Sequence, residues 1–199
     1  MTRLMLDTNL LSTAYLPNPP KWLWDWLGSL PAGAIAIPWI TIYETEYGIR
    51  SVQRYNPSQA IKLLAWFTEF LDSRLTFPEM DVKAARLLGQ MAATPAMKHF
   101  FVTEDRKDKN GDPLKVDRIR LGGDPMLSAL AISHQIPIAT LNINDFLFID
   151  KLFPLPGLYS PKANHWFIDP PIGWEFSRNA NDDHDDTTND WIKSGPRPR

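Results

Sequence analysis

The chain has 199 residues, of which 44% are hydrophobic, and these values indicate a single domain with a sizeable core. Its 21 basic and 23 acidic residues give a net charge of −2, which excludes a general nucleic-acid binder that relies on overall positive charge. Cysteine is absent, so disulfides, thiolate metal sites and cysteine nucleophiles are excluded, which fits a reducing cytoplasm.

Short apolar runs alternate with segments of helical periodicity in the first half of the chain. In the segment at 21–31, Trp22, Trp26 and Leu30 share one helical face, and core packing is the preferred role for these tryptophans. From the N-terminus we predict a strand at 3–6, helices at 9–16 and 21–31, a strand at 34–38, helices at 41–52 and 58–74, a strand at 75–78 and a helix at 80–94.

A charged segment interrupts this pattern at 98–121. Both charge signs are dense there around an Asn-Gly turn signal, and we predict a loop or a hairpin. The alternation then resumes with a helix at 124–135, a strand at 136–141, a helix at 144–149 and a strand at 157–161. Strands that alternate with helices favour an α/β fold, a three-layer α/β/α sandwich with a mostly parallel central sheet.

The C-terminal part differs in composition from the rest of the chain. Residues 1–161 are predicted to form the folded domain, and the aromatic, Pro-rich stretch at 162–176 to form a strap on its surface. Residues 177–199 are acidic and polar, cannot bury enough apolar surface and are predicted to be disordered. The apolar runs are too short for a signal peptide or a membrane span, so we expect a soluble, cytoplasmic protein.

Polar side chains follow the predicted strands where each strand leads into a helix. Asp7 ends the first strand, and Glu44 lies one turn into the helix after the second. Asp124 opens the helix that follows the charged segment, while Asn142, with Asp145 behind it, follows the next strand. Because ligands bind at the carboxyl ends of strands in an open parallel sheet, we expect these side chains to meet at one edge.

Clustered carboxylates suit a hard divalent cation. Mg²⁺ and Mn²⁺ prefer oxygen ligands, and one or two carboxylates with several waters are sufficient to hold such an ion. The ion polarises a phosphate oxygen and helps to deprotonate an attacking water, whereas without it the carboxylates repel one another. No paired-histidine spacing predicts a zinc site.

The same positions also match helix caps. Thr41–Glu44 fits a capping box, Asp124-Pro125 fits an N-cap followed by proline at the first helical position, and Asn142–Asp145 fits a second box. Residue spacing alone therefore supports capping and a metal site about equally.

Four segments occur in a recognisable order: "LMLDTNLLS", "ITIYETEYGI", "LDSRLTFPEMD" and "GGDPMLSALAISHQIPIATLNINDF". Together they resemble a PIN domain of the bacterial VapC type, the toxin half of a toxin–antitoxin pair, from about residue 3 to about residue 161. The resemblance implies a PIN-like fold and an endoribonuclease that depends on Mg²⁺ or Mn²⁺. It also implies an RNA substrate, a cognate antitoxin and a homodimer.

The resemblance assigns roles to individual side chains. In such proteins the first Asp and the Asp of the later helix are the usual metal ligands, and these positions match Asp7 and Asp124. The conserved Glu of the motif matches Glu44, because Thr41 and Gly48 align with its neighbours, and Glu46 is only a nearby acidic residue.

The remaining positions include two departures from the family pattern. The fourth acidic position falls on Asn142, which carries no charge, and Asp145 would then supply the missing carboxylate. Asn9 and Thr140 match polar positions that hold the carboxylates by hydrogen bonds. Pro125 stands where a helix former is commoner, and it is expected to shift the preceding carboxylate.

Two other functions remain to be weighed. Asn142 and Pro125 suggest a PIN-like module that binds RNA or a protein without cutting. A phosphatase of the haloacid-dehalogenase type needs a second Asp two residues after the first, where this chain has Asn9, and is therefore disfavoured.

Overall fold

A five-stranded sheet forms the centre of the molecule in the computed structural model, which describes residues 3–16, 18–102 and 122–175. The strand order is β2-β1-β3-β4-β5; the first four strands are parallel, and β5 pairs antiparallel with β4. The predicted α/β fold with a mostly parallel sheet is thereby confirmed. The strands are β1 (Leu4–Leu6), β2 (Ile35–Ala36), β3 (Ile138–Ala139), β4 (Leu158–Ser160) and β5 (His165–Ile168).

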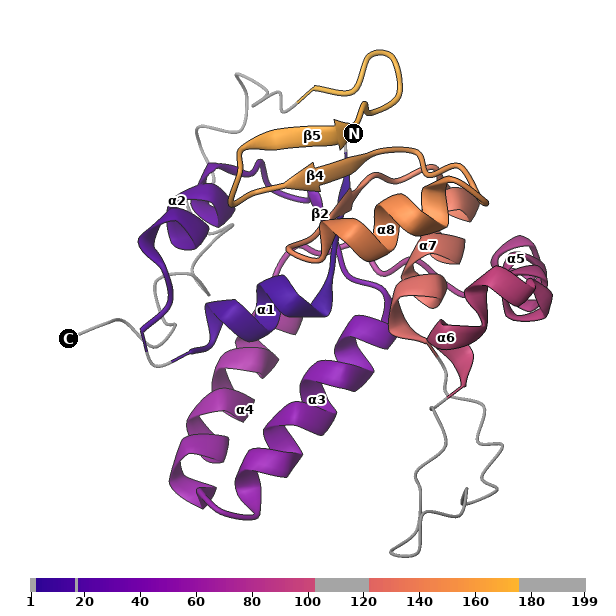
Figure 1. Ribbon diagram of the computed structural model, residues 1–199. Helices are drawn as coiled ribbons and strands as arrows, with labels where there is room; N and C mark the ends of the chain where they lie inside the picture. The colour runs from indigo at the N-terminus through magenta and orange to yellow at the C-terminus, as the bar shows by residue number, and fades with distance from the viewer. Residues whose placement is uncertain (1–2, 17, 103–121, 176–199) are drawn as a thin grey trace, which may run out of the picture.

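Helices cover both faces of this sheet (Figure 1). Side chains alternate along β1, so that Leu4 and Leu6 join one hydrophobic cluster and Met5 joins the other. The helices are α1 (Thr8–Ala14), α2 (Lys21–Ser29), α3 (Trp39–Gln53), α4 (Pro57–Leu71), α5 (Val82–Ala93), α6 (Lys98–Phe101), α7 (Gly123–His134) and α8 (Ile143–Asp150), with a 3-10 turn at Pro95–Met97. The first cluster includes buried residues from α1, α2, α3 and α4, and the second includes buried residues from α5, α7 and α8.

Two predicted elements differ from the structure. The strand expected at 75–78 is reduced to one bridge between Thr76 and Ala36, because Pro78 has no N–H with which to continue a ladder. The loop expected from residue 98 begins instead with the short helix α6, and residues 103–121 lie outside the described part.

The stretch after Pro161, expected to lie on the surface as a strap, adds β5 to the sheet. The indole N–H of Trp174 donates to the carbonyl of Arg3 at 3.1 Å, and the rings of Trp166 and Trp174 meet edge to face 4.9 Å apart. The hydrogen bond and the ring contact hold the stretch after Pro161 next to the start of β1. The tail predicted to be disordered, 177–199, lies outside the described residues.

No helix within the described ranges is both long enough and apolar enough to cross a membrane.

Candidate functional site

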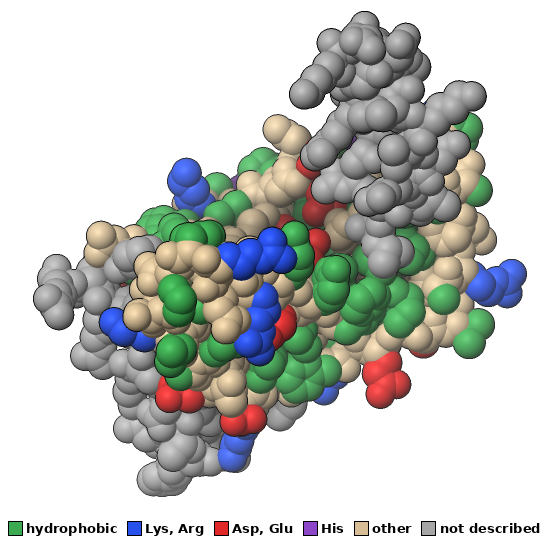
Figure 2. Space-filling model, turned by 90° about the horizontal axis from the view of Figure 1, so that it is seen from below, with side chains coloured by type: hydrophobic (Ala, Val, Ile, Leu, Met, Phe, Trp, Pro, Cys, Tyr) green, Lys and Arg blue, Asp and Glu red, His purple; other side chains and the backbone are tan. Residues whose placement is uncertain are grey.

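The side chains expected at the sheet edge lie at or near the N-terminal ends of four helices. Asp7 follows β1 directly, and Glu44 lies in the second turn of α3. Asp124 lies in the first turn of α7, and Asn142 and Asp145 lie at the start of α8. Seen from the side toward which α3 and α4 project, acidic side chains are visible beside hydrophobic ones (Figure 2).

Asp7 is held by the two polar residues that the family resemblance places beside it. Its side chain is only 7% exposed, and the hydroxyl of Thr140 donates to its Oδ2 at 2.6 Å. The amide of Asn9 donates to the same oxygen and to Thr140 Oγ1, the latter at 2.9 Å. Asn9 Oδ1 in turn accepts from the backbone N–H of Leu141 at 3.1 Å, so the start of α1 is linked to the segment that follows β3.

Glu44 has two neighbours that the sequence motifs did not indicate. Thr8 donates its hydroxyl to Glu44 Oε2 at 2.6 Å. A Cβ placed on Gly123 would come within 2.6 Å of Glu44 Oε1, so only glycine leaves room for the carboxylate in this position. In the sequence, only the position of Thr8 directly after Asp7 could have indicated a role for Thr8. Its hydrogen bond to Glu44 could not be predicted, because it depends on how α1 packs against α3.

Asn142 connects the two remaining carboxylates. Its Nδ2 donates to Asp124 Oδ2 at 3.0 Å and to Asp145 Oδ2 at 2.7 Å. The amide thus offers a shared donor to two acidic groups, although it brings no negative charge of its own. Asp145 thus lies beside Asn142, and its expected role in place of the fourth acid stays a prediction.

The helix caps predicted at these positions are not formed as expected. α3 begins at Trp39, and Thr41 donates its hydroxyl to the carbonyl of Leu6 at 3.2 Å, so the predicted capping box is wrong. The N-cap of α7 is Gly122 rather than Asp124, because the helix starts two residues before the proline. At Asp7 and Asn142, which are N-caps by backbone conformation, the side chain makes no capping hydrogen bond. Capping therefore does not account for the Asp124 and Asn142 side chains, whereas the Asp7 carboxylate still interacts with the backbone N–H groups of Thr8 and Asn9.

Burial and mutual repulsion raise the pKa values of two carboxyl groups. Burial, followed by the charge of Glu44, raises the pKa of Asp7 from 3.8 to about 6, against the lowering effect of Thr140 and of the backbone N–H groups at the start of α1. Burial, followed by the charges of Asp7, Asp145 and Glu44, raises the pKa of Asp124 from 3.8 to about 7. Asp124 therefore lies close enough to the other three acidic groups for their charges to affect it.

The chemistry of these donors fits a hard divalent cation. All four acidic groups offer oxygen, the ligand that Mg²⁺ and Mn²⁺ prefer, and a cation would relieve their repulsion. Within the described ranges, no three His, Cys, Asp or Glu side chains form a group that could hold a metal ion as they stand. Mg²⁺ is commonly bound through one or two carboxylates and several waters, so the fit requires no preformed three-residue group.

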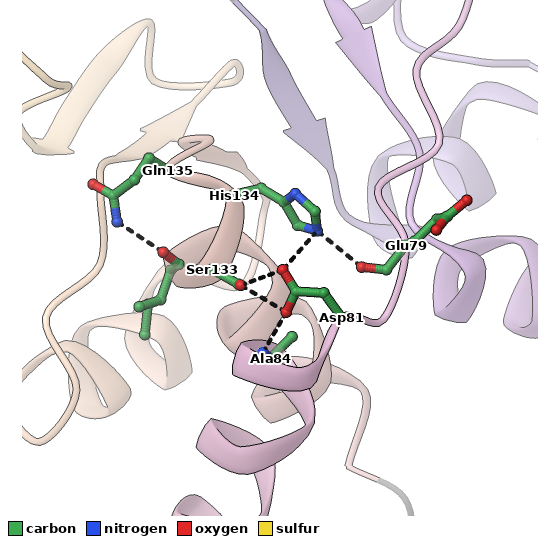
Figure 3. Close-up of polar contacts among 7 residues, drawn as sticks. Glu79, Asp81, Ala84, Ser133, His134 and Gln135 are labelled. Carbon is green, nitrogen blue, oxygen red and sulfur yellow. Dashed lines mark hydrogen bonds and ion pairs between the residues drawn. The ribbon is translucent and has the colours of Figure 1, made fainter.

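A second group of polar side chains lies at the other end of α7 (Figure 3). The Asp81 carboxylate accepts from the backbone N–H of Ala84 at 2.7 Å and from the Ser133 hydroxyl at 2.8 Å. His134 Nε2 lies 2.8 Å from the carbonyl oxygen of Glu79. Asp81 thus caps α5 and ties it to α7, and the hydrogen bonds to Ala84 and Ser133 lower its pKa.

The Asp81→Ala variant is expected to lower Tm at pH 7 by about 2–4 °C through the lost cap. Because the pKa of Asp81 is lowered in the folded state, its contribution is present above the ordinary aspartate pKa and is lost as pH falls through the folded value. Thermal unfolding at pH 7 and pH 3 measures this, and equal Tm losses at both pH values would contradict the capping role. Asp25→Asn, at an exposed ion pair on α2, is the control.

Comparison with known proteins gives a fold but no close relative. No protein-family model matches the chain, and no curated protein matches it. Among solved structures, a chain of DNA-bound VapBC from Salmonella typhimurium is 22% identical with a TM-score of 0.56, covering 81% of this chain and 99% of that one. FitAcB from Neisseria gonorrhoeae gives 20% identity and a TM-score of 0.54, over 80% of this chain and 98% of that one. VapBC2 from Rickettsia felis, bound to a DNA fragment from their promoter, gives 21% identity and a TM-score of 0.53, over the same shares. These similarities confirm the predicted PIN-like fold.

Proposed function

We propose that this chain is a divalent-metal-dependent endoribonuclease, the toxin of a toxin–antitoxin pair, that hydrolyses RNA phosphodiester bonds in the cytoplasm. The observation that carries the proposal is the gathering of four carboxylates beside the carboxyl ends of the parallel strands. Thr140 holds Asp7, and Thr8 holds Glu44 next to Gly123. Asn142 joins Asp124 to Asp145. A fold shared with chains of VapBC and FitAcB supports it.

Asp7 and Asp124 would hold Mg²⁺ or Mn²⁺ directly, and Glu44 would reach the ion through its bound waters. When bound, such an ion polarises the scissile phosphate and lowers the pKa of an attacking water. Thr8 fixes the direction of the Glu44 carboxylate through its hydrogen bond. Glu44 and Asp145 accept hydrogen bonds from waters and orient them, while Asn142 keeps Asp124 and Asp145 together.

The proposal includes two protein partners. The similar structures bear the names of complexes, VapBC and FitAcB, and those from Salmonella typhimurium and Rickettsia felis are described as bound to DNA. We infer a cognate antitoxin that binds this chain and holds its activity in check, and a homodimer in solution. Co-expression with the product of a small neighbouring reading frame, followed by co-purification, tests the first of these.

Cleavage of RNA by the purified protein is the direct test. Structured RNA incubated with Mn²⁺ or Mg²⁺ should be cut at internal positions, and EDTA should stop the reaction. Cleavage that continues in EDTA would show that the activity does not depend on a divalent metal.

A module that binds RNA or a protein without cutting is the second candidate. Asn142 in the place of a fourth acidic residue favours it, because one ligand charge is missing there. Calorimetric titration with Mn²⁺ separates the two candidates, because a binding module should take up no Mn²⁺ that depends on Asp7 and Asp124.

The Gly123→Ala variant is expected to lower metal-dependent cleavage by about 10- to 100-fold while the protein stays folded. The new Cβ would meet only the end of the flexible Glu44 side chain, so the carboxylate moves and the backbone does not have to. The control is Gly89→Ala in α5, where nothing lies within 4 Å of the added carbon. Initial cleavage rates and Tm measure the effect, and equal rates for both variants would contradict it.

A further inference from the structure

Three large aromatic side chains lie exposed along one face of α3. Trp39, Tyr43 and Tyr47 follow one another at intervals of four residues and are 37%, 60% and 63% exposed. Because the helix repeats every 3.6 residues, side chains four apart lie on the same face, about 6 Å from one to the next. We call these three residues the aromatic stripe.

The aromatic stripe runs beside the candidate site. Successive helical residues are rotated by about 100°, which puts Trp39, Tyr43 and Tyr47 within about 80° of one another around α3. The buried residues Thr41, Thr45 and Ile49 occupy the opposite side. Glu44 lies between the two rows, about 60° from Tyr47, so the stripe borders the space that its carboxylate faces.

Two arginines continue the same face beyond the aromatic rings. Arg50 and Arg54 fall at the same helical phase as the aromatic stripe and are exposed. Arg50 also pairs with Glu46 at 2.7 Å on the surface, which leaves both side chains largely in solvent. Figure 2, which views the side toward which α3 projects, shows basic and hydrophobic side chains close together.

We propose that the aromatic stripe is a stacking surface for unpaired bases of RNA whose backbone passes the candidate site. Every base presents a flat face that stacks on aromatic rings whatever its sequence, and exposed arginines attract the phosphates. The inference rests on the proposed function. It adds that the RNA substrate is single-stranded next to the cleaved bond and that this segment lies along α3.

A single-stranded polyanion fits this face better than a second copy of the chain does. The core of a subunit interface is depleted of charged residues, whereas this face carries the exposed Arg50 and Arg54 at the same phase as the rings. The face is also continuous with the acidic site, where the scissile phosphate would have to lie.

The test measures binding separately from cleavage. The full-length protein in EDTA is titrated into a fluorescein-labelled, mixed-sequence single-stranded RNA of 12 nucleotides, and anisotropy gives Kd. Tyr43→Ala and Tyr47→Ala should each raise Kd about fivefold or more. Tyr55→Ala is the matched control, because Tyr55 is 76% exposed and lies beyond the end of α3. The Tyr43→Phe/Tyr47→Phe double variant keeps the rings and should bind like wild type.

Several results would overturn the stacking surface. These are an unchanged Kd in the alanine variants, equal loss in Tyr55→Ala, wild-type protein that prefers the same sequence as a duplex, or wild-type protein that does not bind the RNA at all. A change of oligomeric state in Tyr43→Ala, measured by light scattering, would show instead that the face joins two copies. If cleavage with Mn²⁺ is absent while the tyrosine variants still lose RNA affinity, the proposed function fails and the stacking surface stands.

Discussion

Asp7→Asn is expected to abolish metal-dependent cleavage, with a loss of at least about 100-fold in rate. Loss of a residue that only supports a metal ligand typically costs 10- to 100-fold, so loss of a ligand itself should cost at least as much. Asparagine keeps the size of Asp7 and can still accept the hydrogen bond from Thr140, so the change removes charge and little else. Initial rates with Mn²⁺ and calorimetric Mn²⁺ binding measure the effect.

The loss of cleavage rate expected for Asp7→Asn comes from removing a negative charge at this position. Two further variants test whether the position of the charge matters. Asp25→Asn makes the same chemical change at a side chain that is 60% exposed and paired with Lys21, and should leave the rate unchanged. Asp124→Asn should repeat the loss seen for Asp7→Asn, because Asp124 stands across the same space. Wild-type rates in both site variants would remove the nuclease proposal for this cluster.

Metal affinity is expected to rise steeply between pH 5.5 and pH 7.5. The pKa of Asp7 is raised to about 6 and that of Asp124 to about 7, so both groups hold protons in mildly acidic solution. A cation must displace these protons, and each proton displaced weakens apparent affinity about tenfold per pH unit below its pKa. Calorimetric Mn²⁺ titrations at pH 5.5, 6.5 and 7.5 measure the change; an affinity independent of pH would contradict it.

The same two groups make the metal-free protein less stable at high pH. A folded pKa above the unfolded value means that stability is fully present below about pH 4 and is lost as pH rises through 6 and 7. For Asp7 alone, the difference between a pKa of 3.8 and one of about 6 corresponds to ~3 kcal/mol of stability. Tm in EDTA should therefore fall from pH 5 to pH 8, less so in Asp7→Asn. Mg²⁺ should raise Tm at pH 8 in wild type only.

Local sequence patterns predicted most of the fold. The apolar run before Asp7 is fully buried as β1, and the helical spacing from 124 to 135 closely matches α7. Periodicity succeeds there because burial on one face is encoded locally. It failed at 75–78, where Pro78 limits pairing, and it did not anticipate that the segment after Pro161 would add β5. Pairing of an edge strand depends on a distant partner, which a local pattern does not contain.

Sequence alone identified the polar side chains near the N-terminal ends of the helices around the sheet: Asp7, Glu44, Asp124 and Asn142 with Asp145. Their expected catalytic roles stay predictions, as do the metal and the RNA. Only the tertiary structure distinguished a shared acidic space from a set of helix caps, because hydrogen bonds and mutual repulsion depend on distances between segments far apart in the chain. The importance of Thr8 and Gly123 could be recognised only in the tertiary structure for the same reason. Each residue lies next to Glu44 in space, and its neighbours in the sequence do not indicate that contact.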